Sequence, residues 1–150
     1  MTDPVTFEIV KHRLWQINDE QGIAIKTISA SPIVVEGNDF NVGLFTRDAE
    51  LVTAGIGSLV HVTTMGDALS SIIDGGESIE DGDIFMTNDP FLGALHQNDV
   101  VVASPLFRNG DIFMWIGNVL HHPDVGGCDA GSFCINARTL EDDPPRFFMK

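Results

Sequence analysis

The sequence predicts an α/β fold (α+β), in which an amphipathic N-terminal helix packs on a largely antiparallel or mixed sheet. Two observations carry this prediction. Apolar residues between positions 4 and 28 recur every three or four residues, which is the period of one helix face. Two apolar runs, 100–107 and 112–120, flank Asn109-Gly110, a dipeptide typical of a two-residue turn between antiparallel strands.

The size and composition favour one folded domain. The chain has 150 residues, of which 43% are hydrophobic and 20% are charged, and this composition excludes a disordered chain. Twenty-two acidic residues against eight basic ones give a formal net charge of −14. Because nucleic acids and anionic membranes are bound through Lys and Arg, we expect neither as a partner.

The first expected element is the helix over residues 4–28. Asp3 supplies an N-cap, and Pro4 suits the first helical position. We expect one face of the helix to cover the sheet. Its residues follow a 3,4 spacing: Phe7, Val10, Leu14, Ile17, Gln21, Ala24 and Ile28. The helix ends before Pro32, since a proline disfavours helical backbone in the preceding residue.

The chain then becomes rich in strands and turns. The expected elements are a strand over 40–45, a turn over 47–50, a strand over 51–53, a short helix over 65–72, a turn over 80–83, an apolar segment over 84–86 and the hairpin of 100–120. Gly75-Gly76 closes the short helix. Residues 141–145 include two prolines and continue neither a strand nor a helix.

The hairpin brings polar residues to one end of the sheet. His96 and Asp99 precede its first strand, and His121 follows its second. With a regular two-residue turn, Asp99 would pair with Leu120 and point away from the face that carries His121. A three-residue loop or one β-bulge would instead set Asp99 opposite His121. Convergence of His96, Asp99 and His121 therefore requires one irregularity or a loose strand end.

These residue types suit a divalent metal. Imidazoles and a carboxylate form a mixed nitrogen and oxygen set that Zn²⁺, Mn²⁺ and Fe²⁺ accept. The alternative is a group of polar loop residues at a sheet edge. Asp39 begins a strand and can supply another oxygen, although such a residue is typical of a turn. Cys128 and Cys134 match no standard zinc motif.

The remaining polar segments carry weaker signals. Asp89 lies in a turn sequence, and we expect a structural role for it. The segment 124–127 offers backbone N–H groups that can hold an oxyanion, although glycines after a strand usually mark a turn. His12 and His61 have no partner in the pattern and are expected on the surface or in the core.

Five segments together resemble the hydantoinase B/oxoprolinase family. They are Asp3-Pro4-Val5-Thr6-Phe7-Glu8, Asp39-Phe40, Asn88-Asp89-Pro90, His96-x-x-Asp99 and His121-His122-x-Asp124-x-Gly126-Gly127. The resemblance extends over nearly the whole chain and implies a divalent metal, Zn or Mn, held by Asp39, His96, Asp99 and His121. Because family members are several times longer, the resemblance identifies residues 1–150 as the N-terminal metal-binding portion of a B subunit. Either this portion is separately encoded or cleaved, or the rest of the subunit is another chain.

The resemblance also implies an enzyme subunit. Since Gln97 follows His96, the pattern is more similar to the acetone and acetophenone carboxylase branch. There, a partner of the hydantoinase A type uses ATP and Mg to activate the ketone or bicarbonate, and the metal-bearing subunit stabilises the enolate. Two alternatives stay open: ATP-dependent opening of a cyclic amide, as in hydantoinases, oxoprolinases and lactamases, and a non-catalytic scaffold within the hetero-oligomer.

The carboxylase interpretation gives roles to the residues near the metal. His122 is the candidate for proton transfer, or it orients His121. Asp124, Gly126 and Gly127 are candidates for substrate binding. No stretch is long and apolar enough for a membrane span, and the N-terminal residues lack the pattern of a signal peptide, so we expect a cytoplasmic protein.

Overall fold

A computed structural model describes residues 3–150; Met1 and Thr2 lie outside the described residues. Its elements are α1 (Pro4–Ile28), α2 (Pro32–Val35), β1 (Phe40–Thr46), β2 (Leu51–Ala54), α3 (Val60–Asp74), β3 (Phe85–Thr87), the 3-10 turn η1 (Pro90–Leu92), β4 (Asp99–Arg108), β5 (Asp111–His121) and β6 (Phe148–Met149). The strands form one sheet in the order β2-β1-β5-β4-β3-β6, with every pairing antiparallel. The predicted fold class is therefore confirmed.

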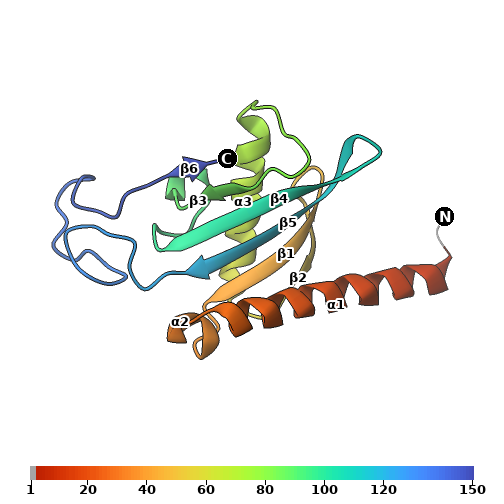
Figure 1. The fold of residues 1–150 in the computed structure, drawn as a ribbon, viewed down its shortest axis with the longest axis horizontal. Helices are drawn as coiled ribbons and strands as arrows, with labels where there is room; N and C mark the ends of the chain where they lie inside the picture. Colours follow the sequence, from red (N-terminus) through yellow and green to blue (C-terminus); the bar gives the residue numbers. More distant parts are fainter. Residues whose placement is uncertain (1–2) are drawn as a thin grey trace.

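Helix α1 begins and ends where the sequence predicted. Asp3 Oδ2 accepts a hydrogen bond from the amide of Thr6 at 3.0 Å, and Pro4 occupies the first turn. Only the second half of the helix packs on the sheet, where the buried Asn18 donates to the carbonyl of Thr53 at 2.9 Å. The first half extends past the sheet (Figure 1), so Phe7 of the predicted apolar face is 57% exposed.

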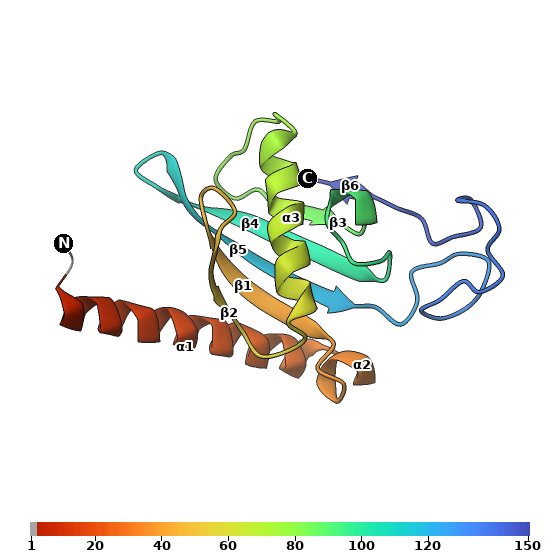
Figure 2. The same cartoon turned by 180° about the vertical axis from the view of Figure 1, so that it is seen from behind.

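Helix α3 lies across one face of the sheet (Figure 2) and supplies much of the core. Met65 and Leu69 are fully buried against Phe45 of β1 and Trp115 of β5. The helix is longer than predicted, because it starts at Val60 instead of near Met65. Residues 60–64 are mostly β-branched and favour helix weakly, so burial against the sheet overrides their local preference.

The hairpin of β4 and β5 contains the irregularity that the sequence analysis required. Asn109 and Gly110 have φ values of 57° and 90°, as a two-residue turn of the primed type demands. Next to the turn, Phe107 pairs with Ile112, but Leu106 pairs with Met114. Phe113 is therefore the extra residue of a β-bulge. Because of this bulge, Asp99 lies opposite His121.

A long loop, residues 122–147, follows β5 and returns the chain to the sheet (Figure 1). Asn88 holds its end, donating from Nδ2 to the carbonyl of Pro145 at 2.9 Å and accepting at Oδ1 from the amide of Phe147 at 2.8 Å. The chain then pairs with β3 as the short strand β6, which the sequence analysis did not predict. Within residues 3–150, no helix combines the length and the apolar character needed to cross a bilayer.

Candidate metal centre

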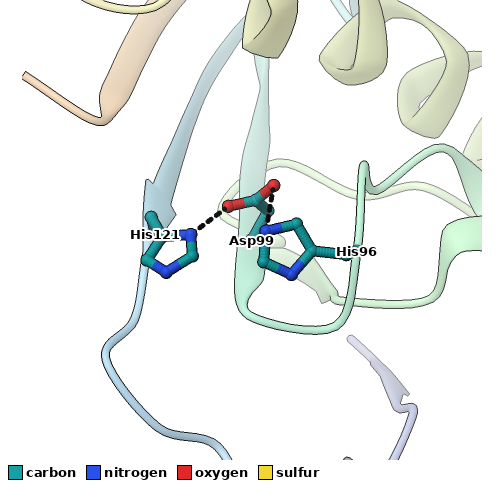
Figure 3. A group of neighbouring side chains, drawn as sticks. All are labelled: His96, Asp99 and His121. Carbon is teal, nitrogen blue, oxygen red and sulfur yellow. Dashed lines mark hydrogen bonds and ion pairs between the residues drawn. The ribbon is translucent and has the colours of Figure 1, made fainter. Parts of the chain in front are cut away.

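Asp99 is the centre of a cluster of histidines at the end of the β4–β5 hairpin. Its side chain is 0% exposed. Oδ1 lies 3.1 Å from Nδ1 of His121, and Oδ2 lies 3.3 Å from Nε2 of His96 (Figure 3). His96 precedes β4, and its carbonyl accepts the amide of Asp99 at 2.9 Å, which turns both side chains toward one another. The structure thus brings His96, Asp99 and His121 together.

His121 is held by contacts on both sides of its ring. Its backbone amide donates to the carbonyl of Asp39 at 3.1 Å, which continues the pairing of β5 with the segment that leads into β1. Nε2 of the ring lies 2.8 Å from Oγ of Ser132 in the long loop. Histidines that bind metals use such an outer partner to fix the orientation of the ring. Ser132 therefore fixes the direction in which Nδ1 of His121 points.

Asp39 lies beside the cluster and is 39% exposed. One of its oxygens, Oδ2, lies 3.7 Å from Nδ1 of His121. The other, Oδ1, lies 2.8 Å from Nε2 of His61, a residue that the sequence analysis left without a partner. His61 is only 2% exposed, and its Nδ1 lies 3.9 Å from Asp99 Oδ2. Of the two expected locations of His61, on the surface or in the core, the structure shows the buried one, but its contacts are with the candidate site.

The cluster fits a divalent cation. One ligand atom from each of His96, Asp99 and His121 lies within 4.8 Å of the others. Asp99 Oδ2 is buried and has no hydrogen-bond partner, which is costly for a carboxylate oxygen unless a positive charge neutralises it. Two imidazoles and a carboxylate are ligands that Zn²⁺ and Mn²⁺ accept. A cation bound by these three side chains would satisfy the unpaired oxygen.

Two histidines at this end of the sheet have pKa values below the ordinary range. Burial lowers the pKa of His96, and the neighbouring Asp99 carboxylate opposes this effect only in part. Partial burial also lowers the pKa of His122, and the adjacent His121 lowers it further. Both rings are therefore neutral at neutral pH. The neutral imidazole is the form that binds a metal or accepts a proton.

His122 is bonded to the strand end through its backbone, whereas His121 contacts Asp99 through its ring. Its amide donates to the carbonyl of Asn98 at 2.7 Å, and its carbonyl accepts from Nδ2 of Asn98 at 2.8 Å. In the described part of the chain, no hydrogen bond or ion pair joins the His122 ring to Asp99 or the other histidines. The backbone of His122 therefore closes the strand end, and its ring stays available.

The segment that follows His122 forms hydrogen bonds within its own loop. Asp124 accepts at Oδ1 from the amide of Gly126 at 2.8 Å and at Oδ2 from the amide of Gly131 at 3.0 Å. The Gly126 amide is thus already used, although it was a candidate for binding a substrate oxygen. Gly127 has a φ of +106°, and a Cβ there would lie 2.5 Å from Sγ of Cys134. These residues shape the loop, and their predicted role in substrate binding stays a prediction.

A pocket of about 290 Å³ opens beside the cluster, between the His96 turn and the long loop. His96 and Asn98 line one side of the pocket, and Phe133 and Cys134 line the other. The Phe133 ring stacks on the His96 ring, with 5.7 Å between their centroids and 18° between their planes. A small molecule in this pocket would therefore touch the edge of the cluster at His96.

The chain is similar to known proteins over most of its length. The family model described as hydantoinase B/oxoprolinase matches residues 3–147. 5-Oxoprolinase 1 of Arabidopsis thaliana is 31% identical over 133 residues, covering 88% of this chain and 10% of that protein. The acetone carboxylase alpha subunit of Xanthobacter autotrophicus is 32% identical over 111 residues, covering 71% of this chain and 14% of the subunit. The chain spans 10% to 25% of the length of the first relatives that it matches.

Solved structures agree with this comparison. The nucleotide-free structure of acetone carboxylase superposes with a TM-score of 0.81 at 29% identity, covering 87% of this chain and 18% of that one. The ATP-dependent caprolactamase from Pseudomonas jessenii gives a TM-score of 0.80 over 99% of this chain and 26% of that one. Its identity is 20%, so this is a likeness of fold alone. The family match over residues 3–147 shows that the chain belongs to the hydantoinase B/oxoprolinase family.

Proposed function

We propose that residues 1–150 are the N-terminal metal-binding portion of an ATP-dependent ketone carboxylase subunit of the acetone or acetophenone type. The observation that carries the proposal is the buried Asp99 carboxylate, which faces His96 and His121 and leaves Oδ2 without a hydrogen-bond partner. The identity of 32% with an acetone carboxylase alpha subunit supports the choice of reaction. The proposed ligands of a Zn or Mn ion are Asp39, His96, Asp99 and His121.

The residues of the cluster have separate tasks in this proposal. When bound, a divalent cation supplies a Lewis acid that stabilises negative charge on a substrate oxygen. Asp99 and His121 stand on paired strands, so their positions are fixed before substrate arrives. Their burial keeps water away from the ligands. His122, with its lowered pKa, accepts a proton from the substrate at a ring nitrogen.

The substrate and the partner follow from the same proposal. The pocket of about 290 Å³ beside His96 has room for a small ketone or a small cyclic amide. ATP and its Mg ion bind to a partner subunit of the hydantoinase A type. The metal-bearing chain therefore works within a hetero-oligomer, where other subunits complete the walls of the pocket.

A second candidate function keeps the site and changes the reaction. The identity of 31% with a 5-oxoprolinase supports ATP-dependent hydrolysis of a cyclic amide. In that case, His122 would accept a proton from the attacking water. A third possibility, a scaffold subunit without catalysis, would leave the cluster without any effect on turnover.

One experiment separates these functions. The complex that contains this chain and its ATP-binding partner is incubated with ATP, ¹⁴C-bicarbonate and either acetone or acetophenone, and in parallel with ATP and a lactam. We expect labelled carboxylate from the ketone, abolished by Asp99→Asn and retained by Asp89→Asn, since the Asp89 side chain caps η1 and pairs with Arg146 and not with a residue of the cluster. Lactam opening without labelling would favour the hydrolase, and equal turnover by wild type and Asp99→Asn would favour the scaffold.

A further inference from the structure

His61 is a buried histidine that the proposed ligand set does not use. It is the second residue of α3, and its side chain is 2% exposed. The ring lies between the two candidate carboxylate ligands, with Nε2 toward Asp39 and Nδ1 toward Asp99. Any buried histidine needs polar partners for its ring nitrogens, but here both neighbouring carboxylates are candidate metal ligands, which points to a role in the site.

The contact with Asp39 sets the direction of that carboxylate. Nε2 of His61 lies 2.8 Å from Oδ1 of Asp39, and an ionised carboxylate can only accept, so Nε2 carries the hydrogen of this bond. Asp39 is 39% exposed, and an exposed side chain is free to rotate unless something holds it. The bond to His61 leaves the other oxygen, Oδ2, facing His121 Nδ1 at 3.7 Å.

The contact with Asp99 is of another kind. Nδ1 of His61 lies 3.9 Å from Oδ2 of Asp99, which is too long for a hydrogen bond. Both atoms are closed to solvent and lack a hydrogen-bond partner. The ring therefore lies against the Asp99 carboxylate without a hydrogen bond to Oδ2, which faces His96 Nε2 at 3.3 Å. His61 thus binds one oxygen of Asp39 and contacts Asp99 without taking up Oδ2.

The backbone around His61 is itself anchored to the sheet. The His61 amide donates to the carbonyl of Ser58 at 3.3 Å, and its carbonyl accepts from Oγ1 of Thr64 at 2.9 Å. The same Ser58 carbonyl accepts from Nδ2 of Asn41 in β1 at 2.9 Å. The first turn of α3 is therefore tied to the strand that follows Asp39, which fixes the distance between His61 and the carboxylate.

We propose that His61 is a positioning residue for metal binding, which acts through its Nε2–H···Oδ1 bond to Asp39 and through packing against Asp99. The inference rests on the metal site proposed above. Groups that orient metal ligands from outside change metal affinity by about 10- to 100-fold when they are removed. We expect a loss of that size when the bond to Asp39 is lost, with little change in the fold.

Two substitutions distinguish the two ring nitrogens. The side-chain amide of Gln takes the place of Nε2, so His61→Gln keeps a donor for Asp39 Oδ1. The shorter amide of Asn takes the place of Nδ1, so His61→Asn loses that donor. The test measures the dissociation constants of Zn²⁺ and Mn²⁺ by competition with a chromophoric chelator, and the melting temperature of each protein with EDTA. A merely structural role would move the melting temperatures and leave the metal affinity unchanged.

The expected result is affinity close to wild type for His61→Gln and about 10- to 100-fold weaker binding for His61→Asn. Equal affinities in all three proteins, or retention by His61→Asn with loss in His61→Gln, would overturn the inference. If His61→Asn does not fold, the metal affinity of His61→Gln is the test. A loss of affinity in His61→Gln contradicts the role of Nε2, and retained affinity supports that role. Absence of binding by the wild type would instead remove the metal site itself.

Discussion

The strand end around Asp99 and the long loop beside it build the candidate site by different means. Asp99 and His121 stand on paired strands above a core that includes Trp115 and Phe45. The loop, residues 122–147, contains no regular element and faces solvent over most of its length. Pairing within the sheet therefore positions the candidate metal ligands, whereas hydrogen bonds at the surface position the loop that forms the wall of the pocket.

Acidic side chains hold that loop together. Asp129 accepts from the amide and the side chain of Asn136, at 2.8 and 2.9 Å. Asp142 accepts from the amides of Arg138 and Thr139, both at 3.0 Å. Asp124 accepts two glycine amides in the same way. These bonds lower the pKa of each of the three carboxyls. These three aspartates thus stabilise the loop through hydrogen bonds within it.

The largest difference between the two regions is expected in global stability. Phe45→Ala empties a fully buried position in the core of the sheet and should lower the free energy of unfolding by about 3–5 kcal/mol. Phe133→Ala, at a loop position that is 72% exposed, should change it by no more than about 0.5 kcal/mol. Urea unfolding followed by tryptophan fluorescence measures both. Similar losses for the two variants would mean that the loop is part of the core.

A matched pair of glycines tests how tightly the loop packs. Gly127 and Gly131 have φ values of +106° and +105°, so alanine is strained at both. A Cβ at Gly127 would also meet Cys134 Sγ at 2.5 Å, whereas at Gly131 it meets nothing within 4 Å. In a Cys128→Ser background, Gly127→Ala should speed the reaction of Cys134 with a thiol reagent by on the order of tenfold more than Gly131→Ala. Equal rates would show that the loop is loose around Cys134.

Acid should open the loop before it affects the sheet. The amides of Gly126 and Gly131 lower the pKa of Asp124 from its ordinary 3.8, so the folded loop favours the ionised form. The contribution of these bonds is therefore complete above the unfolded pKa and is lost as the pH falls through the lower folded value. Below about pH 3.8, the protection factors of the Gly126 and Gly131 amides, which compare each exchange rate with that of an unfolded peptide at the same pH, should fall, while Val101 and Val119 stay protected. Equal protection of loop and sheet amides throughout would argue against this account.

A modest effect is expected from removing the bulge itself. Deletion of Phe113 shortens β5 by the unpaired residue and leaves Asp99 opposite His121, since the turn and the strand beyond Met114 keep their pairing. Phe113 is 53% exposed, and the loss of stability should be on the order of 1 kcal/mol. Cross-strand nuclear Overhauser effects between residues 99 and 121 report the register. Their disappearance would show that the bulge positions the ligands in a way that pairing alone does not.

The residues that meet at the strand end could be predicted because they depend on local sequence patterns. Asn109-Gly110 predicts the turn, and counting back along both strands predicts which residues meet at the open end. The counting also exposed a parity problem, and the structure resolves it with the bulge at Phe113. His96 follows from its position three residues before Asp99. Hence the His96–Asp99–His121 cluster could be predicted from the hairpin, whereas Asp39 was only a possible oxygen donor there, and the family resemblance alone made it a ligand.

The contacts of His61 and the hydrogen bonds of the loop could not be predicted, for a physical reason. His61 reaches Asp39 across 22 positions of sequence and a helix packed over the sheet, and no periodic pattern encodes such a contact. The available signal was a single polar residue among the apolar positions of the buried face of α3, next to Val62 and Met65. In the loop, glycines and aspartates indicate turns, but they do not indicate which amide each carboxylate accepts. Ser132 beside His121 could not be found for the same reason.

The metal content of the purified protein shows whether the His96–Asp99–His121 cluster holds a divalent ion. Wild type, His96→Ala, Asp99→Asn and the control Asp89→Asn are dialysed without chelator and analysed by inductively coupled plasma mass spectrometry. We expect stoichiometric Zn or Mn in the wild type and the control, and loss of this metal from the two cluster variants. Wild-type protein without a bound divalent ion, or cluster variants that keep it, would contradict a metal centre at the end of this hairpin.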